Sequence, residues 1–153
     1  MYTLLLEDEE KKDSYQDTMD HKNKVEIVCG ILSDSLLSRG TIHDNSKLTG
    51  TEKEGYDNLT ANLSDLKYGT QEYRDALKAA KPTIDHHYKE NRHHPEHFEN
   101  GINDMDLVDI SEMFCDWVAA CKRTKDGDIL KSLKINKERF NTRRIVQYFR
   151  KYC

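Results

Sequence analysis

The stretch MDLVDISEMFCDWVAACKR, residues 105–123, decides the fold class of this chain. Its apolar side chains recur at steps of three and four residues, which places them on one face of a helix. They are Leu107, Ile110, Phe114, Trp117 and Cys121. The stretch therefore predicts an amphipathic helix from Met105 to Arg123, and helical spacing continues along most of the chain.

A second strong helical pattern lies near the N-terminus. It runs from about Ser14 to Arg39, and Gly40 supplies a C-terminal stop. Its inward stripe is formed by Val25, Val28, Leu32 and Leu36. Because His21 lies four residues before Val25, it projects from the same stripe.

Weaker helical patterns fill most of the remainder. They lie near residues 43–48, 51–66, 69–92, 129–133 and 142–152. Pro82 is expected to kink or divide the third of these helices, and His94-Pro95 to end it. Only two prolines occur, and no run of alternating β-branched residues indicates a strand. We predict a single all-α domain, a helical bundle that spans residues 1–153.

Composition narrows the class of protein. A length of 153 residues indicates one domain with one core, and a net charge of −4 argues against the whole surface being a nucleic-acid footprint. Cys29 and Cys115 fall in apolar helical segments and are expected in the core. No segment resembles a signal peptide or reaches membrane-spanning length, so we predict a cytoplasmic protein with reduced thiols and no membrane partner. The basic residues that gather from Lys134 onward are either a solvated helix face or an attraction for an anionic ligand.

The histidines are concentrated rather than scattered. Five of the seven lie within residues 86–97, and His43 is followed directly by Asp44. Imidazole mixed with carboxylate is typical of catalytic metal sites, which keep one coordination position open for water. No phosphate-binding glycine loop, serine nucleophile elbow or His-Glu-x-x-His helix competes with this interpretation. The pattern predicts a metallohydrolase.

Helical spacing divides the histidine-rich segment into two neighbouring rows. The rows are His87, Asn91 and His94 on one face, and His86, Glu90 and His93 on the next. Either row could present ligands at one end of a bundle. Whether His86 or His87 faces the site depends on the helix phase near Pro82, so both stay open.

Three carboxylates share one face of the helix at residues 105–123, namely Asp109, Glu112 and Asp116. An acidic stripe opposite an apolar stripe is normally solvated. Asp116 is the ligand that we expect, because apolar neighbours indicate partial burial and a buried carboxylate needs a partner. Glu112 is the second choice.

Four polar side chains near these ligands are candidates for supporting chemistry. Lys47 comes four residues after His43, and Lys47 and Arg92 could each meet an anionic oxygen of a bound phosphate. Glu96 is a candidate base or a residue that orients a ligand, and His97 is expected to orient a ligand rather than bind the metal.

These residues resemble the HD superfamily of metal-dependent phosphohydrolases. The pattern of that superfamily is a helical His, an adjacent His-Asp and a distant Asp. It is matched here by His21, His43-Asp44 and Asp116. The resemblance covers residues 21–116, which is most of the chain.

The context of the His-Asp pair is similar to the His-Asp-x-x-Lys form of the HD-GYP branch, with Lys47 as its lysine. That branch adds a helical His and a His-His-Glu element, which His87 (or His86) and His93-His94-Pro95-Glu96 resemble. The Gly-Tyr-Pro motif of the branch is missing after Gly101. The chain is also similar to small bacterial and phage proteins with His-Asp-x-Ser-Lys and Asn-Arg-His-His-Pro-Glu-His-Phe signatures.

The resemblance implies a bundle of the HD-domain type that hydrolyses a small phosphate ester, such as a nucleotide, with a metal-activated water. One ion would be held by His21, His43, Asp44 and Asp116, and a second by His87, His93 and His94 with Asp44 as the bridge. Ligands of these types suit Mn, Fe, Co, Ni or Zn. The expected catalytic residues are Asp44, Lys47, Arg92 and Glu96.

Two other functions stay open. Some HD-fold proteins use the same kinds of ligand for a two-iron site in oxygen-dependent chemistry. The third hypothesis is a metal-stabilised helical domain that binds a nucleotide or a protein without catalysis. The class of ester, the number of metals and the oligomeric state are also left open.

Overall fold

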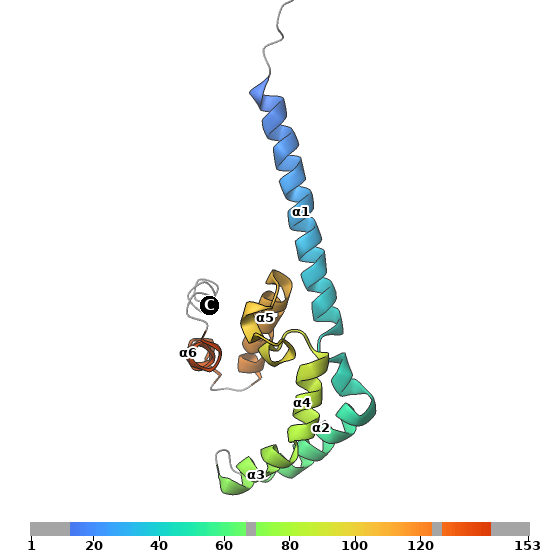
Figure 1. Cartoon of the computed structure of the whole chain (residues 1–153), viewed down its shortest axis with the longest axis vertical. Helices are drawn as coiled ribbons and strands as arrows, with labels where there is room; N and C mark the ends of the chain where they lie inside the picture. The colour runs from blue at the N-terminus through green and yellow to red at the C-terminus, as the bar shows by residue number, and fades with distance from the viewer. Residues whose placement is uncertain (1–12, 67–69, 124–126, 142–153) are drawn as a thin grey trace, which may run out of the picture. The chain divides into compact units, whose positions relative to one another are not determined.

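The computed structural model describes residues 13–66, 70–123 and 127–141 (Figure 1). These residues form helices without any strand, which confirms the predicted all-α fold. None of the described helices combines the length and the apolar character needed to cross a membrane. The chain divides into two compact units, residues 1–35 and 36–153. The helix predicted at residues 142–152 lies outside the described residues.

Helix α1 runs from Ser14 to Ile42 and contributes to both units. The predicted stop at Gly40 is wrong, because the helix continues through this residue. Glycine ends a helix when it takes the left-handed conformation, and that conformation is taken here by Asp44, whose φ is 58°. The His-Asp pair therefore lies in the turn that follows α1.

The first unit contains most of α1 and no other described helix. Val25, Val28 and Leu32, which were predicted to face a core, are exposed. Cys29 is exposed as well, so its predicted core position is wrong. Helical spacing identifies the stripe, but burial requires a partner surface, which spacing does not supply.

The described part of the second unit begins with the last turns of α1 and continues through five further α-helices. They are α2 (Gly50–Leu63), α3 (Gln71–Ala79), α4 (Lys81–Glu90), α5 (Leu107–Lys122) and α6 (Ile129–Phe140). Short 3-10 helices lie between them, namely η1 (Asn45–Leu48), η2 (Pro95–His97) and η3 (Gly101–Asn103).

The helix predicted over residues 69–92 is divided at Ala80 into α3 and α4. Pro82 lies in the first turn of α4, where a missing N–H costs no hydrogen bond. The predicted stop at His94-Pro95 is wrong, because α4 already ends at Glu90. Asn91 takes an extended conformation. Its side-chain amide donates to the His87 carbonyl oxygen at 2.8 Å and so supplies a hydrogen bond to the last turn of the helix.

Helices α2 and α4 lie side by side (Figure 1). Gly55 permits their close approach, because a Cβ added there would lie 2.1 Å from Thr83 Oγ1 and 2.8 Å from Thr83 Cβ. One turn away on each helix, Glu52 Oε1 and His87 Nδ1 meet at 2.5 Å. The two contacts show that the helices are antiparallel. The missing side chain at Gly55 thus sets the separation at which these ionisable groups meet.

A capping box fixes the start of α5. The Asp106 side chain accepts from the Asp109 backbone N–H at 2.8 Å, and the Asp109 side chain accepts from the Asp106 N–H at 3.1 Å. The helix predicted at residues 105–123 is therefore confirmed, with its first turn defined by two aspartates.

The apolar core lies between α5 and α6. Leu133 of α6 is fully buried, and the side chains packed against it are Ile110, Phe114, Trp117 and Ile129. Central members of the apolar face predicted for α5 thus do face the core. Cys115 lies off this face and is exposed, so the prediction that it belongs to the core is wrong.

The described interior is as polar as it is apolar. Its buried apolar residues are Leu59, Pro95, Met105, Met113 and Leu133, and its buried polar ones are Glu52, His87, His93, Asp109 and Glu112. Charged groups are seldom buried unless a partner compensates the loss of hydration. The second unit is therefore built around a polar centre, and the apolar core between α5 and α6 lies to one side of it.

We expect Gly55→Ala to lower the free energy of unfolding by about 1–3 kcal/mol, because the added methyl group overpacks the contact with Thr83. Gly30→Ala is the matched control, since Gly30 is also helical and a Cβ there meets nothing within 4 Å. That control should stabilise the helix by roughly 0.5–1 kcal/mol. Urea denaturation followed by circular dichroism measures both, and equal effects of the two variants would contradict the close approach.

Candidate metal centre

His43 and Asp44 lie in the turn between α1 and η1. Asp44 has a left-handed backbone (φ 58°, ψ 15°), which aspartate tolerates better than most side chains. Lys47 Nζ donates to Asp44 Oδ2 at 2.7 Å. The other oxygen, Oδ1, is buried and has no hydrogen-bond partner. The turn therefore presents one unsatisfied carboxylate oxygen to the interior.

The segment after α4 carries two further histidines of the site, His93 and His94. Its first residue, Asn91, anchors it beside the Asp44 turn by donating to Ser46 Oγ at 2.9 Å. His94 is extended (φ −100°, ψ 127°), as is usual before a proline. This irregular backbone places His93 and His94 next to Asp44, in positions that a continuous helix would not give.

Four residues form the first ligand group: Asp44, His87, His93 and His94, with ligand atoms that all lie within 4.8 Å of one another. Asp44 Oδ1 is 3.3 Å from His87 Nε2 and 3.6 Å from His93 Nε2. His87 Nε2 and His94 Nε2 are 2.9 Å apart. His93 Nε2 is buried and, like Asp44 Oδ1, lacks a hydrogen-bond partner. These donors could hold a metal ion.

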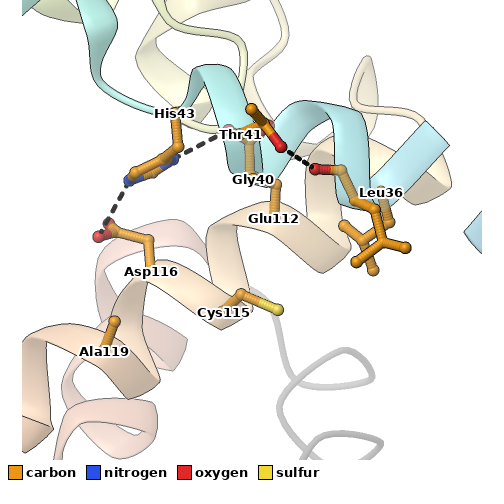
Figure 2. Close-up of a pocket in the computed structure, with 9 residues that line it drawn as sticks. Leu36, Gly40, Thr41, His43, Glu112, Cys115, Asp116 and Ala119 are labelled. Carbon is orange, nitrogen blue, oxygen red and sulfur yellow. Dashed lines mark hydrogen bonds and ion pairs between the residues drawn. The ribbon is translucent and has the colours of Figure 1, made fainter. Parts of the chain in front are cut away.

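The second ligand group consists of His43, His93 and Asp116, whose ligand atoms also lie within 4.8 Å of one another. His43 Nε2 lies 3.6 Å from Asp116 Oδ1 (Figure 2) and also 3.6 Å from Asp44 Oδ2. The ring centroids of His43 and His93 are 4.2 Å apart. Because His93 belongs to both groups, the two candidate positions adjoin at this residue.

Buried carboxylates contact the Nδ1 atoms of three of the imidazoles. Glu52 Oε1 is 2.5 Å from His87 Nδ1, and Glu112 Oε1 is 2.9 Å from His43 Nδ1 and 3.4 Å from His93 Nδ1. A carboxylate at Nδ1 keeps the proton on that nitrogen and leaves Nε2 free for a metal. Sequence reasoning did not single out Glu52, because its burial depends on α4 and not on its own helix.

Two arginines neutralise the acidic face of α5. Asp109 is 0% exposed and accepts from Arg39 Nη1 at 3.0 Å and from Arg92 Nη2 at 2.7 Å, an arrangement that we call the Asp109 clamp. Arg39 Nη2 also lies 2.6 Å from Glu112 Oε2. The expectation of a solvated acidic stripe is wrong for Asp109 and Glu112, because these ion pairs compensate the cost of burying them.

The imidazoles of the two groups differ in charge. Burial lowers the pKa of His94 to about 3 and also lowers the pKa of His87. The carboxylates of Asp116 and Glu112 raise the pKa of His43 to about 10. At neutral pH, His87 and His94 are therefore unprotonated and ready to coordinate, whereas His43 must first lose a proton. The first ligand group is the better prepared to take an ion.

The donors could hold a metal ion. The expectation that the ion is Mn, Fe, Co, Ni or Zn stays a prediction from the general preference of these metals for imidazole nitrogens combined with carboxylate oxygens. His43, Asp44 and Asp116 keep 24%, 27% and 30% of their side-chain surface exposed. An ion bound by these residues would therefore remain reachable by water and by a small ligand.

Most of the predicted ligands lie together in the structure: His43, Asp44, His87, His93, His94 and Asp116. His21 lies in the first unit, is exposed, and belongs to neither group. Of the two histidines left open, His87 is buried and belongs to the first ligand group, whereas His86 is exposed and belongs to neither group. The second group thus contains His93 beside His43 and Asp116, where the resemblance implied His21.

The predicted supporting residues have different surroundings. Lys47 lies beside the first ligand group through its bond to Asp44. Arg92 instead pairs with Asp109, and Glu96 is exposed and pairs with Arg139 of α6. The predicted contacts of these three residues with a substrate stay predictions. In the structure, Arg92 and Glu96 form ion pairs with residues outside the two ligand groups.

A protein-family model matches residues 10–151, which is nearly the whole chain. The chain belongs to the DUF5662 family. This is a family of unknown function, so membership assigns no chemistry to the two ligand groups. No curated protein matches the chain, and no solved structure does. The resemblance to the HD superfamily therefore stays a prediction based on residues.

We expect Asp109→Asn to lower the free energy of unfolding by about 3 kcal/mol, because it leaves two arginines without their buried counter-charge. The control is Asp85→Asn, since Asp85 forms an exposed ion pair with Lys81 and should contribute less than about 0.5 kcal/mol. Urea denaturation of the metal-free protein measures both. Equal stabilities of the two variants would show that the clamp does not hold the unit together.

We expect Glu52→Gln to weaken metal binding roughly 10- to 100-fold, the usual effect of removing a carboxylate that orients a ligating histidine. Glu54→Gln changes an exposed residue of the same helix and should leave the affinity unchanged. Calorimetric titration of chelator-treated protein with Mn²⁺ or Co²⁺ gives both affinities. An unaltered affinity in Glu52→Gln would mean that the contact with His87 serves folding alone.

Proposed function

We propose that this chain is a metal-dependent hydrolase of small phosphate esters. The observation that carries the proposal is the pair of buried atoms Asp44 Oδ1 and His93 Nε2, which are 3.6 Å apart and have no hydrogen-bond partner. Native interiors seldom leave such atoms unsatisfied. His87 and His94 offer donor nitrogens at the same place. A bound cation is the partner that all of these donors share.

The first ligand group would hold the resident ion, and His43 and Asp116 would border an adjoining position. A divalent ion bound there lowers the pKa of a coordinated water and offsets negative charge on a phosphoryl group. The protein's own contribution is the orientation of the ligands: Glu52 and Glu112 hold imidazole rings by their Nδ1 atoms. Preorganised donors of this kind are what phosphoryl transfer requires.

The position of Lys47 favours a hydrolytic metal site over a purely structural one. Its ammonium lies 2.7 Å from Asp44 Oδ2 and 5.0 Å from the centre of the Tyr56 ring. About a third of the side chain is exposed, at 32%. From this position it can meet a non-bridging oxygen of a phosphate bound at the ion, and a structural site has no need of such a cation.

The metal content of wild-type protein and of Asp44→Ala tests the proposal. Protein purified without chelator or affinity metal should contain at least one equivalent of a transition ion by mass spectrometry, and the variant should lose it. Hydrolysis of generic phosphate esters should fall more than about 100-fold, since a ligand is removed rather than a residue that supports one. Asp57→Ala changes an exposed aspartate of α2 and should leave metal content and activity unchanged.

Two results would contradict the proposal. One is protein that takes up no ion even after incubation with Mn, Fe, Co, Ni or Zn. The other is protein that binds an ion through Asp44 but hydrolyses no phosphate ester. Oxygen consumption by an iron-loaded sample would identify oxygen-dependent chemistry in its place.

A further inference from the structure

A cavity of about 530 Å³ lies beside the second ligand group, lined by the last turns of α1, by His43 and by α5 (Figure 2). Its size is that of a pocket for a small organic molecule. Its apolar lining residues are Leu36, Leu37, Cys115 and Ala119. All of the lining residues belong to the second unit.

The polar groups of the cavity are gathered on one side. Figure 2 shows His43 and Asp116 facing each other, with Leu36 on the opposite side of the view. The Thr41 hydroxyl is occupied, because it donates to the Leu37 carbonyl oxygen at 3.0 Å. Glu112 is occupied by His43 and Arg39. The cavity is therefore apolar except where it meets the second ligand group.

The charge of the lining excludes highly anionic occupants. Its nine residues include two carboxylates, Glu112 and Asp116, which already compensate the positive charge of His43, and no lysine or arginine. Of Arg39 and Lys47, the first is already paired with Asp109 and Glu112, so Lys47 is left to meet a phosphate oxygen. A triphosphate would bring several negative charges against this wall with too little compensation. A single phosphate group, in contrast, can be compensated by a bound ion and Lys47.

We propose that this cavity binds the apolar part of the substrate, and that the substrates are phosphate monoesters of small uncharged alcohols or phenols rather than nucleoside polyphosphates. The inference rests on the proposed function, because it takes hydrolysis at the neighbouring ligand groups as given. The phosphate lies at His43 and Asp116, and the apolar part lies among the apolar lining residues Leu36, Leu37, Cys115 and Ala119. Burial of that part supplies affinity that the lining cannot supply by charge.

The reaction itself is an ordinary ester hydrolysis. The oxygen of water forms a bond to phosphorus, the bond between phosphorus and the ester oxygen breaks, and a proton from the water passes to the departing alcohol. The products are inorganic phosphate and a neutral apolar alcohol. The alcohol has no charge that would retain it in the cavity, so it can leave without a dedicated cation or carboxylate.

The first test is binding of two non-hydrolysable analogues to protein purified without chelator. By calorimetry, benzylphosphonate should bind at least about tenfold more tightly than methylphosphonate, as expected for burial of one aromatic ring. Ala119→Phe should abolish this preference by filling the cavity. Ala120→Phe is the matched control, because Ala120 is the next residue of α5, is exposed and does not line the cavity.

The second test is turnover of benzyl phosphate, methyl phosphate and ATP. The ratio of kcat/KM for benzyl phosphate to that for methyl phosphate should fall about tenfold or more in Ala119→Phe and stay constant in Ala120→Phe. Because each variant is compared with the wild type on the same two esters, differences in the intrinsic reactivity of the esters cancel. ATP should be the poorest substrate. Equal binding of the two phosphonates by wild-type protein, or a preference for ATP, would overturn the inference.

The outcomes separate this inference from the proposed function. If benzylphosphonate binds preferentially and Ala119→Phe removes the preference, but no ester is hydrolysed, the cavity assignment stands and the hydrolase proposal fails. If esters are hydrolysed without any preference for an apolar group, the hydrolase proposal stands and the cavity assignment fails. A melting curve of each variant confirms that it is folded, and the wild-type comparison does not depend on either variant.

Discussion

The second unit depends on a single buried carboxylate, that of Asp109. It receives hydrogen bonds from Arg39 in the last turns of α1 and from Arg92 in the segment after α4, and it caps its own helix. Arg39 lies four residues before His43, and Arg92 lies directly before His93. The clamp therefore places two candidate ligands against α5, the helix that carries Glu112 and Asp116.

The arrangement of charges explains how so polar an interior is tolerated. Arg39 and Arg92 pair with the Asp109 carboxylate, and Arg39 also pairs with Glu112. Glu112 in turn contacts the imidazoles of His43 and His93. Each ionisable group in this series is compensated by its neighbour, as buried charges require. Asp44 Oδ1 and His93 Nε2 face each other at 3.6 Å and are buried without a hydrogen-bond partner. The same holds in the described residues for one oxygen each of Glu52 and Glu112 and for one ring nitrogen of His97.

The chemistry of the residues and the helical periodicity of the sequence predicted the all-α fold and most of the residues of the two ligand groups. The spacing in residues 105–123 identified α5, and the combination of His43-Asp44 with the later histidines identified most of the two ligand groups. Both inferences use information that is local to the sequence: the period of an amphipathic helix and the ligand preferences of imidazole and carboxylate.

The features that sequence reasoning missed depend on contacts between distant residues. Glu52 meets His87 across 35 positions, and Arg39 meets Asp109 across 70. Nothing in the neighbourhood of Asp109 distinguishes a buried carboxylate from a solvated one. The same limit explains Cys29 and Cys115, which have apolar neighbours along the chain but are exposed in the part of it that the structure describes.

The long separation between the histidines and their carboxylates also orders events during synthesis. A chain emerging from its N-terminus carries His43, His87, His93 and His94 before Asp109, Glu112 and Asp116 have been made. Asp44 and Glu52 precede His87, His93 and His94 in the sequence, so every donor of the first ligand group is made before α5. The second ligand group, in contrast, is complete only when α5 docks, because Asp116 and the carboxylate that contacts His43 both come from that helix.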